Sequence, residues 1–450
     1  MEAPETFYAK TPDGLHIAYQ VLGSGPFDLV YTPGWVFNVD AAWDLPGYGA
    51  FLGALSRISR VIVFDRRGSG LSDRPIAAES LALEFGVEDL RAVMDAVDST
   101  SAVLFGFEDG GMLTTMFAAA DPDRVTALVL FAPWATLKQS DDYPWGWNEE
   151  EISEWERRDA EEWGTTANAS WNLSMSAPGR EHDETFVRAM ARFFRAAASP
   201  GAIRAVDRMH RSIDARPVLD SVHVPTLVLQ RSDDRMGELG EARYIAGRIA
   251  GASLIELPGN EHAPWLGDVD SVVRSIRDFV SSLDEERALI DRVLATVLFT
   301  DIVGSTERAA SLGDAAWKDL VERHHHVVRT MLSRYQGTEI DTAGDGFFAT
   351  FEGPARAILC AQAMVGALEP MEIQIRSGIH TGEVESIDGK VGGLAVVIGA
   401  RVAARAGASD VLVSQTVKDL VAGSGLGFED AGEHELKGVP DRWHLYRVVS

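Results

Sequence analysis

The segment AVLFGFEDGG (102–111) joins a short apolar run, Ala102–Phe105, to a glycine-rich turn centred on Glu108. Three further apolar runs of similar length are Phe27–Tyr31, Val61–Phe64 and Ala127–Phe131. Such runs, each followed by a Gly- or Pro-rich loop, are typical of parallel strands that are buried on both faces. The spacing between them leaves room for helices, so the first 135 or so residues predict right-handed βαβ units and a doubly wound sheet.

The pattern changes between about Lys138 and Val218. This segment shows no clear strand and carries many acidic residues among five tryptophans, Trp145, Trp147, Trp155, Trp163 and Trp171. It predicts a helical lid (138–218) inserted into the sheet domain. The strand–helix alternation then returns with Pro225–Gln230 and Ser253–Leu257, and a helix from Val269 to about Leu283 closes the unit. We therefore expect a first domain of α/β class over residues 1–283.

A second unit follows a charged stretch, DEERALIDRVL (284–294), which predicts a helical linker. The expected elements are a strand Ala295–Thr300, a helix from about Asp314 to Tyr335, two strands around the turn Ala343–Gly346, a helix from Pro354 to Leu368 and a strand Ile373–Ile379. The order βαββαβ describes a ferredoxin-like sandwich. We expect this smaller α+β domain to occupy residues 295–450.

The charge balance is strongly acidic, with 41 Lys and Arg against 68 Asp and Glu, a net charge of −27. Such a surface repels nucleic acids and anionic lipids, so we expect neither as a partner. The single cysteine, Cys360, excludes an internal disulfide and fits a reducing compartment. The N-terminal residues lack the pattern of a signal peptide, and no apolar run approaches the length of a membrane span. These features predict a cytoplasmic protein.

Two aspartates of the second unit stand at turns next to predicted strands. VLFTDIVGST (297–306) places Asp301 at the end of a strand, and AGDGFFATF (343–351) places Asp345 at the tip of a hairpin. Either motif alone could be a simple turn former. Strand pairing can bring both carboxylates to one sheet edge, and two hard oxygen ligands beside a phosphate-sized loop suit Mg²⁺ or Mn²⁺. Two such ions could activate a hydroxyl and neutralise a leaving pyrophosphate, which predicts a nucleoside triphosphate as substrate.

The same region, from about Ala295 to Val448, resembles the catalytic domain of class III adenylate/guanylate cyclases. The motifs that carry the resemblance are VLFTDIVGST, TAGDGFFATF, IRSGIHTGEV (375–384), GARVAARAG (399–407) and ELKGV (435–439). The resemblance implies conversion of a nucleoside triphosphate into a 3′,5′-cyclic monophosphate and pyrophosphate by a head-to-tail homodimer. Asp301 and Asp345 would hold two Mg²⁺ or Mn²⁺ ions, and the partner chain would supply groups for the base, the ribose and the phosphates.

Those partner positions depart from the family pattern in part. Asp341 stands where the adenine-reading lysine is usual, Lys390 replaces the companion aspartate, and Val397 replaces the ribose-orienting asparagine. Arg401 matches the arginine at the α-phosphate, and Lys437 resembles a phosphate-contacting lysine. Asp341 and Lys390 could read guanine, since a carboxylate suits N1–H and N2–H while an ammonium suits O6. The pair could also read adenine, with Asp341 accepting from N6, but less naturally; the remaining alternative is a plain salt bridge in a site that selects no base. Because loss of one aimed donor costs roughly 10²–10³ in rate, we expect metal and nucleotide binding with weak turnover.

The first domain, about residues 5–283, resembles the α/β-hydrolase fold. PGW (33–35) matches its oxyanion-hole loop, FDRRGSGLSDRP (64–75) its Asp-x-Arg-Gly turn, and GFEDGG (106–111) its nucleophile elbow. The resemblance implies a catalytic order of Glu108, Asp234 and His262, although Glu108 replaces the elbow serine. Its extra length would misplace an attacking oxygen, and we expect an ion pair with His262 instead. In the simplest alternative, Asp234 caps a turn and satisfies His262.

Three functions remain open at this point. The first is a purine nucleotide cyclase, active or degenerate, with a hydrolase-like regulatory domain. The second is an ester-type hydrolase with a cyclase-like dimerisation module. The third is a non-catalytic scaffold that responds to a small lipophilic ligand in the pocket beneath the lid.

Overall fold

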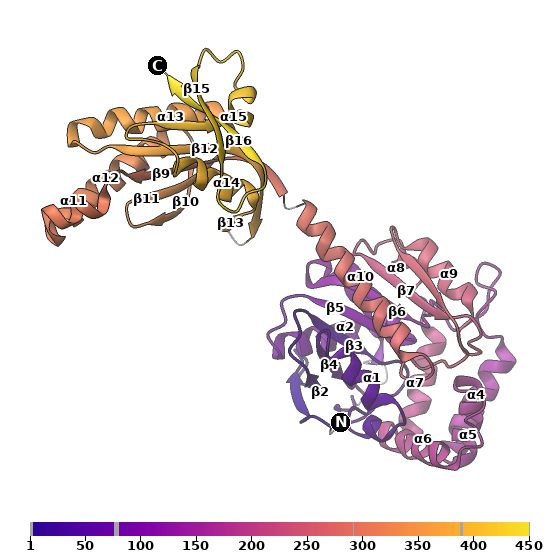
Figure 1. The fold of residues 1–450 in the computed structure, drawn as a ribbon. Coiled ribbons are helices and arrows are strands. Elements are labelled where there is room, and N and C mark those ends of the chain that lie inside the picture. Colours follow the sequence, from indigo (N-terminus) through magenta and orange to yellow (C-terminus); the bar gives the residue numbers. More distant parts are fainter. Residues whose placement is uncertain (1–2, 76–80, 291, 388–389, 450) are drawn as a thin grey trace. The chain divides into compact units, whose positions relative to one another are not determined.

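The computed structural model describes residues 3–75, 81–290, 292–387 and 390–449, with the backbone alone at 287–290, 386–387 and 390. The chain divides into two compact units, Met1–Leu283 and Asp284–Ser450 (Figure 1). Each unit has a hydrophobic core of its own. None of the helices in these ranges combines the length and the apolar character that a membrane span requires. The cytoplasmic location stays a prediction.

The first unit is built on an eight-stranded sheet with the order β1-β2-β4-β3-β5-β6-β7-β8. The strands are β1 (Phe7–Lys10), β2 (His16–Leu22), β3 (Asp28–Thr32), β4 (Arg60–Phe64), β5 (Ala102–Phe107), β6 (Val125–Phe131), β7 (Thr226–Arg231) and β8 (Ser253–Leu257). β1 and β2 pair antiparallel, and the pairs from β4 to β8 are parallel. The six predicted strands and the α/β class are confirmed, whereas the two N-terminal strands were not expected.

Helices cover both faces of this sheet. On one face, α1 (Tyr48–Leu55) and α10 (Val269–Ile290) pack against side chains such as Tyr31 and Phe105. On the other face, α2 (Leu83–Ala96), α3 (Asp109–Ala120) and α9 (Leu239–Arg248) pack against Leu104 and its neighbours. Short 3-10 helices lie at Ala41–Asp44 and Pro122–Arg124. The alternation of apolar strands and amphipathic helices therefore produces the doubly wound arrangement that the sequence predicts.

The segment between β6 and β7 is helical, as the tryptophan-rich composition predicts. It contains α4 (Glu149–Glu162), α5 (Thr166–Ser176), α6 (Glu184–Ala197), α7 (Pro200–Ser212) and α8 (Arg216–Leu219). Figure 1 shows the first four of these helices grouped together. α4 begins at Asn148, whose side chain accepts from the backbone N–H groups of Glu150 and Glu151 in a capping box. Of the five tryptophans, Trp163 is buried and the other four are half-buried. Trp163 stacks on Phe194 with ring centroids 4.9 Å apart.

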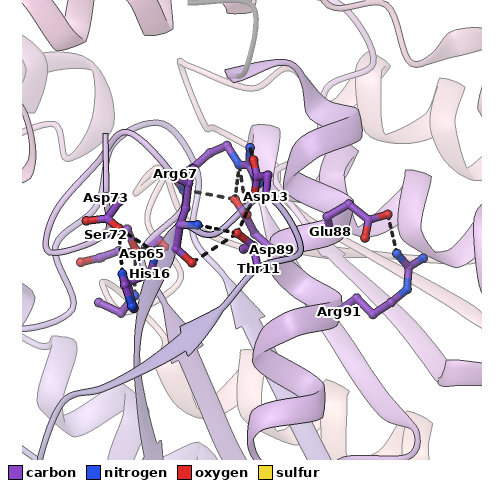
Figure 2. A network of polar contacts seen from close by, with 12 residues as sticks. Thr11, Asp13, His16, Asp65, Arg67, Ser72, Asp73, Glu88, Asp89 and Arg91 are labelled. Carbon is purple, nitrogen blue, oxygen red and sulfur yellow. Dashed lines mark hydrogen bonds and ion pairs between the residues drawn. The ribbon is translucent and has the colours of Figure 1, made fainter. Parts of the chain in front are cut away.

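A polar network fixes the loop that follows β4 (Figure 2). Arg67 lies between two carboxylates, with Nη2 2.6 Å from Asp89 Oδ1 and Nη1 3.0 Å from Asp13 Oδ2. The buried Asp65 carboxylate accepts from two backbone N–H groups, and Ser72 Oγ donates to the Asp65 carbonyl oxygen. These contacts hold the 64–75 turn against β2 and α2, next to the carboxyl edge of the sheet.

The second unit contains a sheet with the order β10-β11-β9-β12-β14-β16-β15. Its elements are β9 (Arg292–Ile302), α11 (Ser305–Leu312), α12 (Asp314–Arg334), β10 (Thr338–Ala343), β11 (Gly346–Phe351), α13 (Pro354–Leu368), a 3-10 helix (Glu369–Met371), β12 (Ile375–Ile387), β13 (Lys390–Gly392), α14 (Leu394–Ala403), β14 (Val411–Ser414), α15 (Gln415–Leu420), β15 (Gly427–Glu435) and β16 (Arg442–Val449). The four strands β10, β11, β9 and β12 are those of the predicted βαββαβ order. The C-terminal strands extend the sheet beyond a ferredoxin-like core.

The predicted linker 284–294 is wrong at its C-terminal end. α10 continues without a break to Ile290, but β9 already begins at Arg292. Arg292, Val293 and Leu294 pair with residues of β12 and are strand rather than helix. The long antiparallel partner supplies backbone hydrogen bonds that a local charge pattern does not reveal.

The two faces of the second sheet carry different helices. α12 and α13 cover one face, around Leu298 and Phe347. α14 lies on the other face and approaches it closely, because a Cβ at Gly399 would lie 2.5 Å from Val297 Cγ2. A Cβ at Gly378 of β12 would overlap the backbone nitrogen of Ala403 at the end of α14. Glycine at these two positions therefore sets the depth at which α14 packs.

Candidate functional sites

The turn between β5 and α3 holds Glu108 in a sharp, left-handed conformation, with φ 50° and ψ −126°. The flanking glycines make this turn possible. A Cβ at Gly106 would lie 2.5 Å from Gly111 Cα, and a Cβ at Gly110 would clash with the carbonyl oxygen of Thr32. A non-glycine residue at positive φ is strained, and such strain is common where a strand-to-helix turn exposes a reactive side chain.

His262 connects two carboxylates at this edge of the sheet. Its Nε2 lies 2.6 Å from Glu108 Oε1, and its Nδ1 lies 2.7 Å from Asp234 Oδ2. Burial disfavours a charged ring, but Asp234 and Glu108 outweigh that cost and raise the pKa of His262 to about 10. At neutral pH the ring is therefore an imidazolium that donates both N–H groups. The ion pair between Glu108 and His262 forms as the sequence predicts.

Besides its contact with His262, Asp234 accepts hydrogen bonds within the turn that follows β7. Its Oδ1 accepts from the backbone N–H of Met236 at 3.0 Å, and its Oδ2 also accepts from Gln230 Nε2 at 3.2 Å. The carboxylate thus caps the turn after β7 and orients the imidazole at the same time. The turn cap and the contact with His262 are the two features of the simpler alternative, and a catalytic role for Asp234 stays a prediction.

Asp109, the residue after the elbow position, was not among the predicted site residues. It is 1% exposed, and its Oδ2 accepts from Arg66 Nη1 at 2.6 Å and from His210 Nε2 at 2.8 Å. Although it is buried, Arg66 and His210 hold the pKa of this carboxyl group well below its usual range. Its Oδ1 accepts from the backbone N–H of Trp35, in the loop after β3. The backbone N–H of Trp35 is therefore already engaged by the Asp109 side chain.

Above this cluster lies a cavity of about 80 Å³ between the sheet edge and the lid. Four tryptophans line it: Trp35, Trp134, Trp147 and Trp155. The carboxyl groups on its wall belong to Glu108, Asp109, Glu156, Asp207 and Glu241. The pocket that the sequence predicts beneath the lid is therefore present, and it is aromatic and acidic together.

In the second unit, Asp301 and Asp345 come together at one edge of the sheet. Asp301 lies near the end of β9, and Asp345 stands at the tip of the β10–β11 hairpin after Gly344, whose φ is 64°. Asp345 Oδ2 accepts from the backbone N–H of Ile302 at 3.2 Å. Burial and the adjacent Asp301 carboxylate raise the pKa of Asp345. Two carboxylates that repel each other in this way are a donor set that fits a divalent cation with a preference for oxygen.

Asp301 also has a cationic neighbour that the sequence did not single out. Arg376, directly opposite on β12, donates from Nε to Asp301 Oδ2 at 3.1 Å. Arg376 lies within IRSGIHTGEV, but the sequence gives no sign of the strand register that pairs it with Asp301. Within the described ranges, no group of three or more His, Cys, Asp or Glu side chains is arranged to hold a metal ion.

The predicted nucleotide-contacting residues lie on other elements of this unit. Arg401 is on α14 and donates from Nε to the carbonyl oxygen of Lys437 at 3.1 Å, so these two basic residues are neighbours. Val397, one turn earlier on the same helix, is 40% exposed. Asp341 is exposed on β10, and its Oδ1 accepts from the N–H of Thr342. Lys390 begins β13, but its side chain lies outside the described residues, so its pairing with Asp341 stays a prediction.

Comparison with known protein families assigns both units. Residues 48–267 match the family described as alpha/beta hydrolase fold, and residues 290–450 match the adenylate and guanylate cyclase catalytic domain. The chain is an α/β hydrolase fold followed by a class III cyclase domain. The resemblances predicted from the elbow, from the Asp-x-Arg-Gly turn and from the two aspartate motifs are confirmed at this level.

Individual relatives match one domain or the other. The pimeloyl-[acyl-carrier protein] methyl ester esterase of Neisseria meningitidis is 26% identical over 201 residues, 44% of this chain and 64% of the relative. "Putative adenylate cyclase 3" of Rhizobium meliloti is 27% identical over 166 residues, 35% of this chain and 28% of the relative. The hydrolase domain also has the fold of an esterase from Exiguobacterium antarcticum, with a TM-score of 0.54, 22% identity and coverage of 62% of this chain and 100% of that one. The chain thus spans less than two thirds of either curated relative.

Proposed function

We propose that this chain is a metal-dependent purine nucleotide cyclase that works as a homodimer and whose hydrolase domain is a ligand-responsive regulator. The observation that carries the proposal is the pair of adjacent carboxylates, Asp301 and Asp345, at the edge of the cyclase sheet. These residues would hold two Mg²⁺ or Mn²⁺ ions. Bound ions would favour ionisation of the ribose 3′-hydroxyl and neutralise the departing pyrophosphate.

The chain's own residues divide the remaining work. Arg376 neutralises part of the charge on Asp301 and fixes the direction of its carboxylate. Arg401 and Lys437 form a basic pair that suits phosphate oxygens. Val397 offers no hydrogen bond to a ribose, so we propose that cyclisation is slow and that binding exceeds catalysis. The base preference depends on Asp341 and Lys390 of the partner subunit, and the acid at 341 favours guanine.

Exposed apolar residues support the homodimer. Leu394 is 53% exposed and Val397 40%, both on α14. Beside them, on the same face of the sheet as α14, the half-buried Phe299 stacks in parallel on the buried Phe348 with centroids 4.6 Å apart. An apolar face of this kind is typical of a protein interface. We propose that the second copy covers it and brings its own Arg401 and Lys437 to the metal pair.

Two observations count against ester hydrolysis by the hydrolase domain. Glu108 is engaged in an ion pair with His262, which as an imidazolium cannot act as a base. The backbone N–H of Trp35, from the loop that normally helps to form an oxyanion hole, is occupied by Asp109. We therefore propose that this domain keeps the pocket of a hydrolase and uses it for binding.

The test is a turnover assay on the purified full-length protein with Mn²⁺ and either ATP or GTP, in which cyclic product is separated by chromatography. Asp301→Asn should lower the rate by at least about 10²-fold, because the metal pair loses a ligand. Asp319→Asn, an exposed change on α12, is the matched control and should retain the rate. Equal product from the wild type and Asp301→Asn would refute the cyclase proposal.

The hydrolase alternative has its own test, with short-chain p-nitrophenyl esters as substrates. We expect the same background release of nitrophenol from the wild type and from His262→Ala. Hydrolysis that disappears with His262 would show that Glu108 or water reacts there, and the domain would then be an enzyme.

A further inference from the structure

The cavity of the hydrolase domain has an unusual chemical character for a pocket in an esterase-like fold. Its wall combines the four tryptophans with five carboxyl groups. Among the described residues that line it, the basic side chains are two histidines, His210 and His262, and there is no Lys or Arg. A neutral ester gains no electrostatic stabilisation from acidic neighbours, and a fatty-acid carboxylate would be repelled by them. The ligand that fits this wall therefore carries positive charge.

Most of these carboxyl groups already have partners. Glu108 pairs with His262, and Asp109 pairs with His210. Asp109 also pairs with Arg66, which is not among the residues that line the cavity.

The remaining partnered acids are held from outside the cavity. Glu156 Oε1 accepts a hydrogen bond from Arg211 Nε at 2.9 Å. Glu241 accepts from Tyr143 Oη at 3.0 Å and from the backbone N–H of Glu238.

Burial raises the pKa of Glu241 to about 8, so this group is largely protonated at neutral pH. Glu108, Asp109 and Glu156 are each paired with a cationic side chain or a histidine, and none of these four groups offers a fully free acceptor.

Asp207 on α7 is the exception. It is 6% exposed and lines the cavity, and its Oδ2 has no hydrogen-bond partner within the described part of the chain. Asp159 on α4 is fully buried nearby, and its Oδ2 is also without a partner. An unsatisfied buried carboxyl oxygen costs free energy, and natural structures rarely keep one without a role. A donor with positive charge, placed in the cavity, would satisfy Asp207.

The aromatic wall beside Asp207 suits the same ligand. Trp35 and Trp155 meet edge to face with centroids 5.4 Å apart, and Trp147 continues the cluster 5.1 Å from Trp155. The face of an indole ring attracts a cation, most strongly where water is excluded. The surrounding rings also provide contacts for a hydrocarbon or aryl group.

We propose that this cavity binds a protonated organic amine, whose ammonium group donates to Asp207 and packs on Trp35 and Trp155 while its apolar body fills the space beneath the lid. A metal ion is a poorer fit, because the aromatic wall supplies no ligand atoms and the carboxylates other than Asp207 are already engaged. The inference deepens the regulatory role proposed above and to that extent rests on it. Binding is measured without the cyclase reaction, so either proposal can fail alone.

The protonation of Asp207 gives the proposal a second observable. Burial, together with the nearby Asp159 and Glu156 on α4, raises the pKa of Asp207 to about 8, while His210 on its own helix and the side chain of Trp35 oppose the shift. Asp159 likewise has its pKa raised by burial, to about 7. Near neutral pH the empty cavity therefore holds protons that a bound ammonium would displace. Amine affinity should rise between about pH 6.5 and pH 8, with release of protons.

The experiment is calorimetric titration of the full-length protein with 2-phenylethylamine, 2-phenylethanol and phenylacetate. We expect the amine to bind at least about tenfold more tightly than the alcohol, and the anion not to bind. Asp207→Asn should reduce amine affinity to that of the alcohol and abolish the proton release seen by repeating the titration in buffers of different ionisation enthalpy. Asp278→Asn, an exposed change on α10, is the matched control and should bind as the wild type does.

Trp155→Phe provides a second variant that keeps an apolar ring in place, and it should weaken the amine without affecting the alcohol. Thermal unfolding of each variant verifies that the domain is folded. Equal affinity for amine and alcohol would show a neutral lipophilic pocket and overturn the proposal. Absence of binding by all three probes, or amine binding that Asp207→Asn leaves intact, would overturn it as well.

Discussion

The carboxyl group of Glu108 occupies the position from which an elbow side chain would attack a substrate, yet its surroundings bind it in place. Carboxylates contact both ring nitrogens of His262, Asp234 at Nδ1 and Glu108 at Nε2. These contacts favour the protonated ring, and the protonated ring in turn engages the Glu108 carboxylate in an ion pair. A protonated imidazole between two carboxylates is a stable electrostatic unit but a poor proton acceptor. The same three positions that would form a catalytic relay with serine thus become a structural link between β5, β7 and β8.

This link predicts a distinct pH dependence of stability. The pKa of His262 is raised to about 10 from an unfolded value of about 6.5, so its contribution is fully present below pH 6.5 and is lost as pH rises towards 10. Glu108→Gln removes one carboxylate, so we expect a lower pKa of His262 and a loss of about 1–3 kcal/mol at pH 7.

Denaturant unfolding at a series of pH values, with NMR titration of the His262 ring, measures both effects. The difference between wild type and variant isolates the Glu108–His262 pair, because every titrating group outside that pair is common to both proteins. Glu256→Gln, which removes an exposed partner of Arg243, should change little at any pH. If the pKa of His262 were the same in Glu108→Gln as in the wild type, Glu108 would not contribute to the raised pKa of His262.

At the residue scale, the sequence predicts polar residues that stand in glycine-containing turns. It does not predict residues whose environment depends on partners far away in the sequence. Asp301 follows an apolar run, Asp345 stands at a glycine-flanked hairpin tip, and Glu108 stands between Gly106 and Gly110, so local pattern was enough to predict the three turns. The functional roles of the three residues stay predictions. Asp109 and Asp207 carry no such mark. The partners of Asp109 lie 43, 74 and 101 residues away, and no local pattern indicates that they meet.

At the scale of elements, close approach of α14 to its sheet determines where Arg401 stands. The helix reaches this depth because Gly378 and Gly399 present no side chain at the contact. Displacement of α14 would move Arg401 and its neighbour Lys437. In the proposed homodimer it would thereby shift them relative to the Asp301 and Asp345 of the second copy. Catalysis is sensitive to shifts of about 1 Å in such groups.

Gly378→Ala tests this arrangement. The added Cβ overlaps the backbone nitrogen of Ala403, so we expect a loss of about 1–3 kcal/mol in stability and at least a tenfold loss of cyclase rate. Gly366→Ala in α13, where a Cβ meets nothing within 4 Å, is the control and should stabilise by about 0.5–1 kcal/mol. Denaturant unfolding and the Mn²⁺-dependent assay measure the two effects. A Gly378→Ala protein with normal rate and stability would show that α14 adapts without cost.

Buried elements of the hydrolase sheet were predicted well because parallel strands read as continuous apolar runs. β1 and β2 were not predicted, because their sequences, FYAK and HIAYQVL, mix polar and apolar residues. β1 lies at the edge of the sheet, and β2 lies between β1 and β4. Tyr8 is exposed on β1, as an edge strand allows. The start of β9 was missed for a related reason, since Val293 and Leu294 depend on pairing with β12 for their strand conformation.

At the scale of the whole molecule, the division into two units has an energetic meaning. Apolar clusters around Phe105 and Leu104 belong to the hydrolase domain alone, and the cluster around Leu298 and Phe347 belongs to the cyclase domain alone. α10 begins against the hydrolase core, where Val272 and Ile276 are fully buried, and it continues into the second unit. Separate cores of this size each support an independent folding unit.

We therefore expect calorimetric unfolding of the full chain to show two transitions that can be shifted one at a time. Gly110→Ala, which clashes with Thr32 at the elbow, should lower only the transition of the hydrolase domain. Gly378→Ala should lower only that of the cyclase domain, and 2-phenylethylamine should raise only the hydrolase transition, because a ligand stabilises the unit that binds it. Gly247→Ala in α9, where a Cβ has open space, serves as the control for the first domain. A single transition that both glycine variants displace equally would show that the two cores unfold as one cooperative structure, and the two domains would then be energetically inseparable.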